Sequence, residues 1–174
     1  MKQLKKITLC VLLLFAVSIL FIASIERETI KVGEKAPAFT VAALNGVDSI
    51  SLSDYKGKIV IVHLWSPTCP HCRETNKVLP GIIGPYSKKA NLAYIMIAID
   101  MDTLTLRPVI EEDKLNFAIH GYDPFDGSAK TMMDYEAPGT PCINIVDEKG
   151  NLVGVNVTDD QLKKYLKKRF SRNS

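Results

Sequence analysis

The tetrapeptide Cys69-Pro70-His71-Cys72 directly follows an apolar run, and this arrangement constrains the fold more than any other feature of the chain. The run, residues 58–65, is nearly continuously apolar, which is typical of a strand buried on both faces of a sheet. Two thiols three residues apart, where such a strand turns into a helix, can close a disulfide and exchange it with another protein. The sequence therefore predicts dithiol redox chemistry at a strand-to-helix junction.

A long apolar segment lies near the amino terminus. Three lysines precede residues 7–25, a stretch of 19 residues without a charged side chain, and such a stretch crosses a bilayer core of roughly 30 Å as a helix. Lysines before the segment and mixed charge after it favour export of the remainder. We predict an anchor or signal segment with a short connection in residues 1–30, retained more readily than it is cleaved, and one extracytoplasmic domain in residues 31–174.

The formal net charge of +3 is unevenly distributed. Residues 163–174 contain six basic side chains and no acidic ones, whereas residues 31–162 contain 12 basic and 17 acidic side chains. This mildly acidic body argues against nucleic-acid binding. The basic residues belong to a final amphipathic helix, and their solvation is favoured over contact with membrane headgroups.

Strand, turn and breaker patterns predict an α/β domain with a central mixed sheet flanked by helices. Strands are expected at residues 38–41, 49–52, 58–65, 92–99, 117–120, 142–147 and 152–157. Helices are expected at residues 73–89 (kinked or broken), 104–115 and 128–135, and from a cap at Asp159 or Asp160 to Phe170. The first two strands form a hairpin around Asn45-Gly46, and the last two form another. The strand–helix–strand order around Cys69 predicts a right-handed parallel crossover.

Three segments in this order carry a family resemblance: residues 62–73, which include the two cysteines; residues 135–141, which end in Thr140-Pro141; and residues 145–153. They resemble the membrane-anchored thioredoxin-like proteins of bacteria, of the TlpA/ResA type. The resemblance implies a thioredoxin-like fold with an added N-terminal β-hairpin and a bacterial cell-membrane location, with the domain facing the periplasm or the outside. It also implies a cis Thr140–Pro141 bond opposite the cysteines that leaves backbone groups free for an extended substrate. Thr140, Pro141 and Trp65 are then expected on the substrate side, with Trp65 packed beneath the site.

The two cysteines are expected to have different roles. A thiolate is favoured at a helix N-terminus, so Cys69 is assigned as the nucleophile and Cys72 as the resolving thiol. Pro70 stiffens the first turn. His71 either adds a positive charge or hydrogen bond near the thiolate, or is an exposed residue without a tuning role. The same four residues occur in DsbA, a strong oxidant with a low thiol pKa.

Three further residues have open roles. His63 stands where thioredoxin has a buried acid, and it is either a neutral base for proton transfer or a satisfied core residue. The family often has Glu three residues after the second cysteine, where this chain has Thr75, so Glu74 is a weaker candidate for proton transfer. Cys142 is either a third redox thiol or, as is more common, a small buried apolar residue.

Together these features predict a monomeric extracytoplasmic thiol–disulfide oxidoreductase without cofactor or bound metal. Its substrates would be protein thiols or disulfides, in disulfide formation, disulfide reduction or cytochrome c maturation, and it would have a membrane redox partner. The Pro-His pair favours an oxidant, whereas the family is often reducing. An alternative is a copper metallochaperone that uses Cys69, His71 and Cys72 as soft ligands. A peroxidase is disfavoured, because Pro67-Thr68-Cys69 does not fit the Pro-x-x-x-Thr-x-x-Cys pattern of that chemistry.

Overall fold

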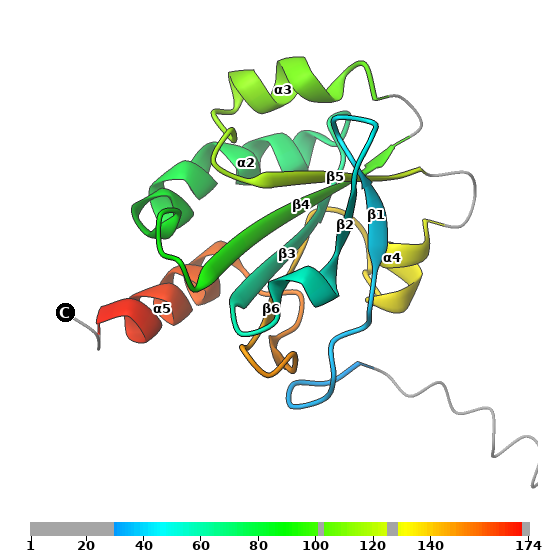
Figure 1. The fold of residues 1–174 in the computed structure, drawn as a ribbon. Helices are drawn as coiled ribbons and strands as arrows, with labels where there is room; N and C mark the ends of the chain where they lie inside the picture. Colours follow the sequence, from blue (N-terminus) through cyan, green and yellow to red (C-terminus); the bar gives the residue numbers. More distant parts are fainter. Residues whose placement is uncertain (1–29, 101–102, 125–128, 172–174) are drawn as a thin grey trace, which may run out of the picture.

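The computed structural model describes residues 30–100, 103–124 and 129–171 (Figure 1). The predicted membrane segment, residues 7–25, lies outside these ranges. Within them, none of the helices has the length and apolar character needed to span a membrane.

A seven-stranded mixed sheet forms the centre of the domain, in the order β2-β1-β5-β4-β3-β6-β7. The β3–β4 and β4–β5 pairs are parallel, whereas the other neighbouring pairs are antiparallel. This arrangement confirms the α/β class, the N-terminal hairpin and the parallel pairing on either side of the Cys69 helix. The strands are β1 (Thr40–Ala43), β2 (Ser49–Ser51), β3 (Ile59–Trp65), β4 (Leu92–Asp100), β5 (Ile119–Pro124), β6 (Cys142–Val146) and β7 (Leu152–Gly154).

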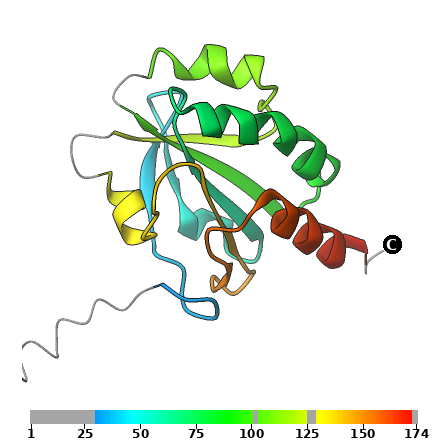
Figure 2. The same cartoon turned by 180° about the vertical axis from the view of Figure 1, so that it is seen from behind.

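Helices cover both faces of the sheet, as the two opposite views show (Figures 1 and 2). One face, called here the α2 face, packs against α2 (Pro70–Ile83), α3 (Leu106–Glu112) and α5 (Asp159–Phe170). The other, called the α4 face, packs against α4 (Lys130–Asp134) and the 3₁₀-helix η1 (Leu52–Tyr55). A second 3₁₀-helix, η2 (Gly84–Tyr86), follows α2. The sheet therefore separates two apolar cores.

Strand β3 lies inside the sheet, between β4 and β6, and all seven of its residues are buried. Its side chains alternate between the two cores, since Ile61 and Trp65 reach the α2 face and Val62 and Leu64 reach the α4 face. Burial on both faces explains why the sequence of this strand is nearly continuously apolar. The carboxyl end of β3 leads into Cys69 and so fixes the position of the two thiols.

Helix α2 confirms the predicted break but places it later than the first proline. The helix continues through Pro80 to Ile83, and only then does the chain change to the 3₁₀ turn of η2, which contains Pro85. The backbone N–H of Gly84 still bonds to the Pro80 carbonyl. The Cys69 end of the helix is therefore a regular α-helix of several turns.

Several predicted ends of elements differ from the structure: the first strand spans Thr40–Ala43 instead of residues 38–41, and the last strand ends at Gly154 instead of residue 157. The N-cap of α5 is Thr158, whose hydroxyl accepts from Gln161 N–H while the Gln161 side chain accepts from Thr158 N–H. This reciprocal capping box leaves Asp159 and Asp160 in the first turn, where their charges favour the helix dipole. The fifth strand begins at Ile119 instead of residue 117, because its register is set by pairing with β4.

Candidate active site

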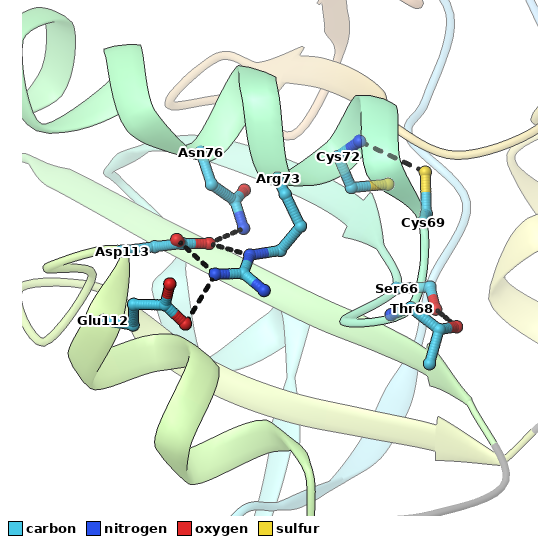
Figure 3. A network of polar contacts seen from close by, with 8 residues as sticks. All are labelled: Ser66, Thr68, Cys69, Cys72, Arg73, Asn76, Glu112 and Asp113. Carbon is cyan, nitrogen blue, oxygen red and sulfur yellow. Dashed lines mark hydrogen bonds and ion pairs between the residues drawn. The ribbon is translucent and has the colours of Figure 1, made fainter.

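Cys69 lies at the junction of β3 and α2 and is the N-cap residue of the helix. The backbone N–H of Cys72 donates to Cys69 Sγ at 3.1 Å (Figure 3). Pro70 occupies the first turn, where its missing N–H leaves no helical hydrogen bond unmade. Unpaired N–H groups and the helix dipole stabilise an anion at this position. The local geometry therefore favours a thiolate at Cys69.

The two thiols have opposite environments. Cys69 is partly exposed and Cys72 is completely buried. Burial acts to raise the pKa of Cys69, but hydrogen bonds from the thiol and backbone N–H of Cys72 outweigh it, so the pKa of Cys69 is lowered. Burial raises the pKa of Cys72 to about 12, and the hydrogen bond to Cys69 adds to this effect. Near neutral pH, Cys69 is thus the more readily ionised thiol and Cys72 keeps its proton.

The Thr140–Pro141 peptide bond is cis and immediately precedes β6. The Cys69 thiol donates to the carbonyl oxygen of Thr140 at 3.5 Å, although 71 residues separate the two. Thr140 and Pro141 are both half-buried. The fold therefore brings together the cysteines and the Thr140-Pro141 segment that the sequence assigns to the same site.

His71 and Glu74 lie on the exposed side of α2 and contact each other. Nδ1 of His71 is 3.5 Å from Oε2 of Glu74. A residue two positions after Cys72 projects from a different side of the helix, and Glu74 is accordingly exposed while Cys72 is buried. The structure thus places Glu74 beside His71 and not beside the buried thiol.

His63 is completely buried on β3, between Ile61 and Trp65, whose side chains lie on the α2 face together with Cys72. Its Nδ1 is 2.8 Å from the hydroxyl of Tyr94 on β4, whereas its Nε2 has no hydrogen-bond partner among the described residues. Burial lowers the pKa of His63 to about 3. The imidazole is therefore neutral near pH 7, with one nitrogen bonded and the other unpaired.

Trp65 packs beneath the site, as the resemblance implies, and does not lie on the substrate side. Its side chain is completely buried on the α2 face of the sheet, within the same core as Cys72. A side chain at the end of a central strand that points under α2 cannot reach a bound partner. Trp65 instead forms part of the packing beneath the cysteines.

Cys142 lies on the opposite face of the sheet from Cys72. It pairs with Leu64 across the β3–β6 ladder, and both side chains belong to the core of the α4 face. Burial raises the pKa of Cys142, against a hydrogen bond from the Asn144 amide at 3.5 Å that lowers it. This placement fits a small buried apolar residue better than a third member of the Cys69–Cys72 pair.

An ion-pair network beside the cysteines is not indicated by any local sequence pattern (Figure 3). The guanidinium of Arg73 donates to both carboxylate oxygens of Asp113, at 2.8 and 3.0 Å, and to Glu112 at 2.8 Å. The amide of Asn76 donates to Asp113 at 3.1 Å. The network joins the first two turns of α2 to the end of α3. Arg73 directly follows Cys72, but nothing near it in sequence identifies a partner 40 residues away.

A second polar cluster holds the loop before Cys69. The hydroxyls of Ser66 and Thr68 both donate to Oδ2 of Asp100, at 3.0 and 3.3 Å. The backbone N–H of Cys69 bonds in turn to the Ser66 carbonyl. Asp100 ends the strand next to β3, so the loop that carries the nucleophile is tied to the sheet.

The described residues contain no group of three or more His, Cys, Asp or Glu side chains arranged to hold a metal ion. Cys69 and Cys72 are close to each other, but the His71 ring contacts Glu74. Cys142 lies on the opposite face of the sheet from Cys72. The ligand set of the copper alternative is therefore not assembled in this part of the chain.

Comparison with known proteins places these features in a family. Thiol-disulfide oxidoreductase ResA of Bacillus thuringiensis subsp. konkukian is 27% identical over 148 residues, which cover 82% of this chain and 81% of that protein. Thioredoxin-like protein YneN of Bacillus subtilis is 28% identical over 129 residues, which cover 74% of this chain and 72% of that protein.

Solved structures agree with the sequence relatives. The thioredoxin domain of a thiol-disulfide oxidoreductase from Bacteroides vulgatus matches with a TM-score of 0.71 at 28% identity, covering 81% of this chain and 99% of that one. The fold is thus thioredoxin-like, and the relatives support an oxidoreductase. The model of the AhpC/TSA family matches residues 32–155, and the chain belongs to this family.

Proposed function

We propose that the chain is an extracytoplasmic thiol–disulfide oxidoreductase that exchanges a Cys69–Cys72 dithiol or disulfide with protein substrates. The observation that carries the proposal is the Cys69 sulfur at the N-terminus of α2, bonded to Cys72 N–H and facing the Thr140 carbonyl. Relatives named thiol-disulfide oxidoreductases support the same activity. Residues 7–25 would anchor the chain in the bacterial membrane, where a membrane protein would restore its redox state.

In the reducing direction, the Cys69 thiolate attacks one sulfur of a substrate disulfide and forms a mixed disulfide, while the other substrate sulfur leaves as a thiolate and takes a proton. Cys72 then loses its proton and attacks Cys69 Sγ. This step closes the Cys69–Cys72 disulfide and releases the second substrate thiol. Two electrons pass from the dithiol to the substrate, and the oxidising direction is the reverse of these steps.

The raised pKa of Cys72 means that the second attack needs a base. His63 is our candidate, because it lies on the same sheet face as Cys72 with a nitrogen that has no hydrogen-bond partner among the described residues. Glu74 is a weaker candidate, since it is exposed beside His71.

The half-buried Thr140-Pro141 segment forms the wall of the site against which a substrate chain would lie. A strand-like segment beside exposed backbone groups can pair with an extended peptide through main-chain hydrogen bonds. Such pairing selects for accessible cysteines more than for a particular side chain. Protein thiols or disulfides are therefore the proposed substrates, with cytochrome c maturation as one process that would supply them.

The test is a pair of cysteine variants of the full chain in an insulin-disulfide reduction assay. Cys69→Ser is expected to abolish exchange, whereas Cys72→Ser is expected to accumulate mixed disulfides that dithiothreitol releases. Undiminished exchange by Cys69→Ser would exclude the proposal. Hydrogen peroxide is offered in parallel, and turnover faster than that of a free thiol would favour a peroxidase.

A further inference from the structure

The cations next to the resolving cysteine are both paired with carboxylates. Cys72 lies between His71 and Arg73, the two basic residues of the first turn of α2. A cation beside a thiolate lowers the pKa of that thiol and stabilises the dithiol form of the couple. The reduction potential of the Cys69–Cys72 couple therefore depends on whether these two basic side chains act on the Cys69 thiolate or are neutralised by other groups.

The charge of Arg73 is engaged on the side of α2 that faces α3. Its guanidinium spans both oxygens of Asp113 and also reaches Glu112, so two carboxylates surround one cation (Figure 3). The side chain of Asp113 is 1% exposed, and solvent screens this pair little. Hydrogen bonding to Asp113 raises the pKa of Arg73. This cation is thus more than compensated where it lies.

His71 is also paired with a carboxylate, on the exposed side of α2. Its ring nitrogen contacts Glu74 at 3.5 Å, and the carboxylate of Asp159, at the start of α5, also interacts electrostatically with it. The hydrogen bonds that lower the pKa of Cys69 come from Cys72, Thr140 and the backbone of His71, and the imidazole of His71 is absent from them. Hydrogen bonds thus lower the pKa of the Cys69 thiol.

We propose that Glu74 and Glu112, the latter together with Asp113, act as counter-ions that withhold the charge of Arg73, and that of His71 when it is protonated, from the Cys69 thiolate. The Cys69–Cys72 couple is then more reducing than its Cys-Pro-His-Cys motif alone indicates. The inference rests on the proposed function and concerns the reduction potential of that same site. Glu74 and Glu112 are positioning residues, because they act through the basic side chains and do not touch the sulfur.

The half-reaction gives the direction in which the reduction potential changes when a counter-ion is removed. The Cys69–Cys72 disulfide takes two electrons and protons to give the dithiol, in which Cys69 ionises most readily. Freeing a cation near Cys69 stabilises the thiolate, favours the dithiol and raises the reduction potential, which makes the disulfide a stronger oxidant. Removing a counter-ion should therefore shift the couple in the oxidising direction.

The experiment measures the reduction potential of the full chain in glutathione buffers and the pKa of Cys69 from the pH dependence of its alkylation. Glu74→Gln and Glu112→Gln are used because both side chains are exposed, at 77% and 71%, so the fold should be retained. Each is expected to increase the equilibrium constant for reduction by roughly twofold to fivefold, as befits exposed ion pairs. A fivefold change corresponds to about 20 mV for a two-electron couple. The pKa of Cys69 should fall in both variants.

Double-mutant cycles separate the proposed route from a direct effect of the carboxylates on the sulfur. The shift of Glu74→Gln should vanish in a His71→Asn background, and that of Glu112→Gln in an Arg73→Gln background. Glu111→Gln, an equal charge change on an exposed residue of α3, is the matched control and should leave the potential unchanged.

Unchanged potentials in Glu74→Gln and Glu112→Gln, or equal shifts with and without the basic partner, would overturn the inference. A shift equal to that of Glu111→Gln would overturn it as well, since it would reflect net charge alone. Failure of the proposed function looks different, because the unsubstituted chain would then show no reversible Cys69–Cys72 couple at all.

Discussion

The two faces of the central sheet each bury a cysteine close to β3, and their surroundings differ. On the α2 face, Cys72 lies within hydrogen-bonding reach of Cys69, at the start of a helix that Arg73 ties to α3. On the α4 face, Cys142 lies among apolar side chains with the Asn144 amide as its polar contact. Burial raises the pKa of both thiols. Reactivity therefore depends on the neighbouring thiol and the helix end rather than on burial.

The largest expected effect is the difference in exchange rate between variants of the two buried thiols, Cys72 and Cys142. Cys72→Ala should lower steady-state exchange by several orders of magnitude, because no second thiol remains to resolve the mixed disulfide. Cys142→Ala should leave the exchange rate within about twofold of the unsubstituted chain, at a stability cost of about 1 kcal/mol for the lost sulfur. Insulin reduction with each variant measures both rates. A loss in Cys142→Ala comparable to that in Cys72→Ala would make Cys142 a third redox thiol.

Alkylation of the reduced, folded chain should distinguish the three cysteines of the described domain. A thiol with a pKa of about 12 is ionised in about one molecule in ten thousand at pH 8, and only the thiolate reacts. Iodoacetamide should therefore label Cys69 and spare Cys72 and Cys142, as read by peptide mass spectrometry. Because the pKa of Cys69 is lowered, its rate should fall as pH drops through a midpoint below that of an ordinary cysteine. Equal labelling of Cys72 in the folded chain would contradict the assigned roles.

The ion-pair network should make the α2 face sensitive to a single acidic residue. Asp113→Ala leaves Arg73 and Asn76 without their buried acceptor, and breaking such a pair costs about 3 kcal/mol of unfolding free energy. Glu112→Ala removes an exposed carboxylate from the same cation and should cost about 0.5 kcal/mol. Urea titrations of both variants give the two values. Equal small losses would mean that α3 does not hold α2 in place.

The sequence predicted those parts of the molecule that depend on neighbours along the chain. The apolar run of β3, the Asn45-Gly46 hairpin and the position of Cys69 at a helix start all follow from local patterns, and the structure has them. Contacts between distant segments were not predictable in this way. The Arg73–Asp113 pair depends on how α3 docks, since nothing beside either residue specifies the other.

The face of the sheet on which a side chain lies was likewise not predictable from the sequence. Trp65 lies close to the cysteines in sequence. Successive side chains of β3 point to opposite faces of the sheet, and this alternation places the Trp65 side chain in the core of the α2 face. The same alternation along β6 places Cys142 on the opposite face of the sheet from Cys72. The position of Cys142 next to Pro141 in the sequence does not reveal this face. A sequence pattern gives the residue type and its position along the chain, whereas the pairing of the strands determines on which face of the sheet the side chain lies.

The last prediction concerns His63, a buried polar residue of the α2 face. Its pKa in the folded chain is about 3, against about 6.5 in an unfolded chain. The unfolded state therefore binds one more proton between these values, so the stability that His63 contributes is present above pH 6.5 and is lost as the pH falls towards 3. Acidification from pH 6.5 to pH 5 should cost about 2 kcal/mol through this residue.

His63→Asn removes the titration while keeping a side chain able to bond Tyr94, whose hydroxyl lies 2.8 Å from Nδ1. Urea unfolding of this variant should vary less with pH between 6.5 and 5 than unfolding of the unsubstituted chain. His120 also has a pKa lowered by burial, so a residual slope is expected, and His120→Asn measures it separately. Identical slopes for the His63 variant and the unsubstituted chain would show that folding does not lower the pKa of His63. A histidine with an ordinary pKa would be a stronger base for the proton of Cys72 than one with a pKa of about 3, so the same measurement bears on the role of His63 in exchange.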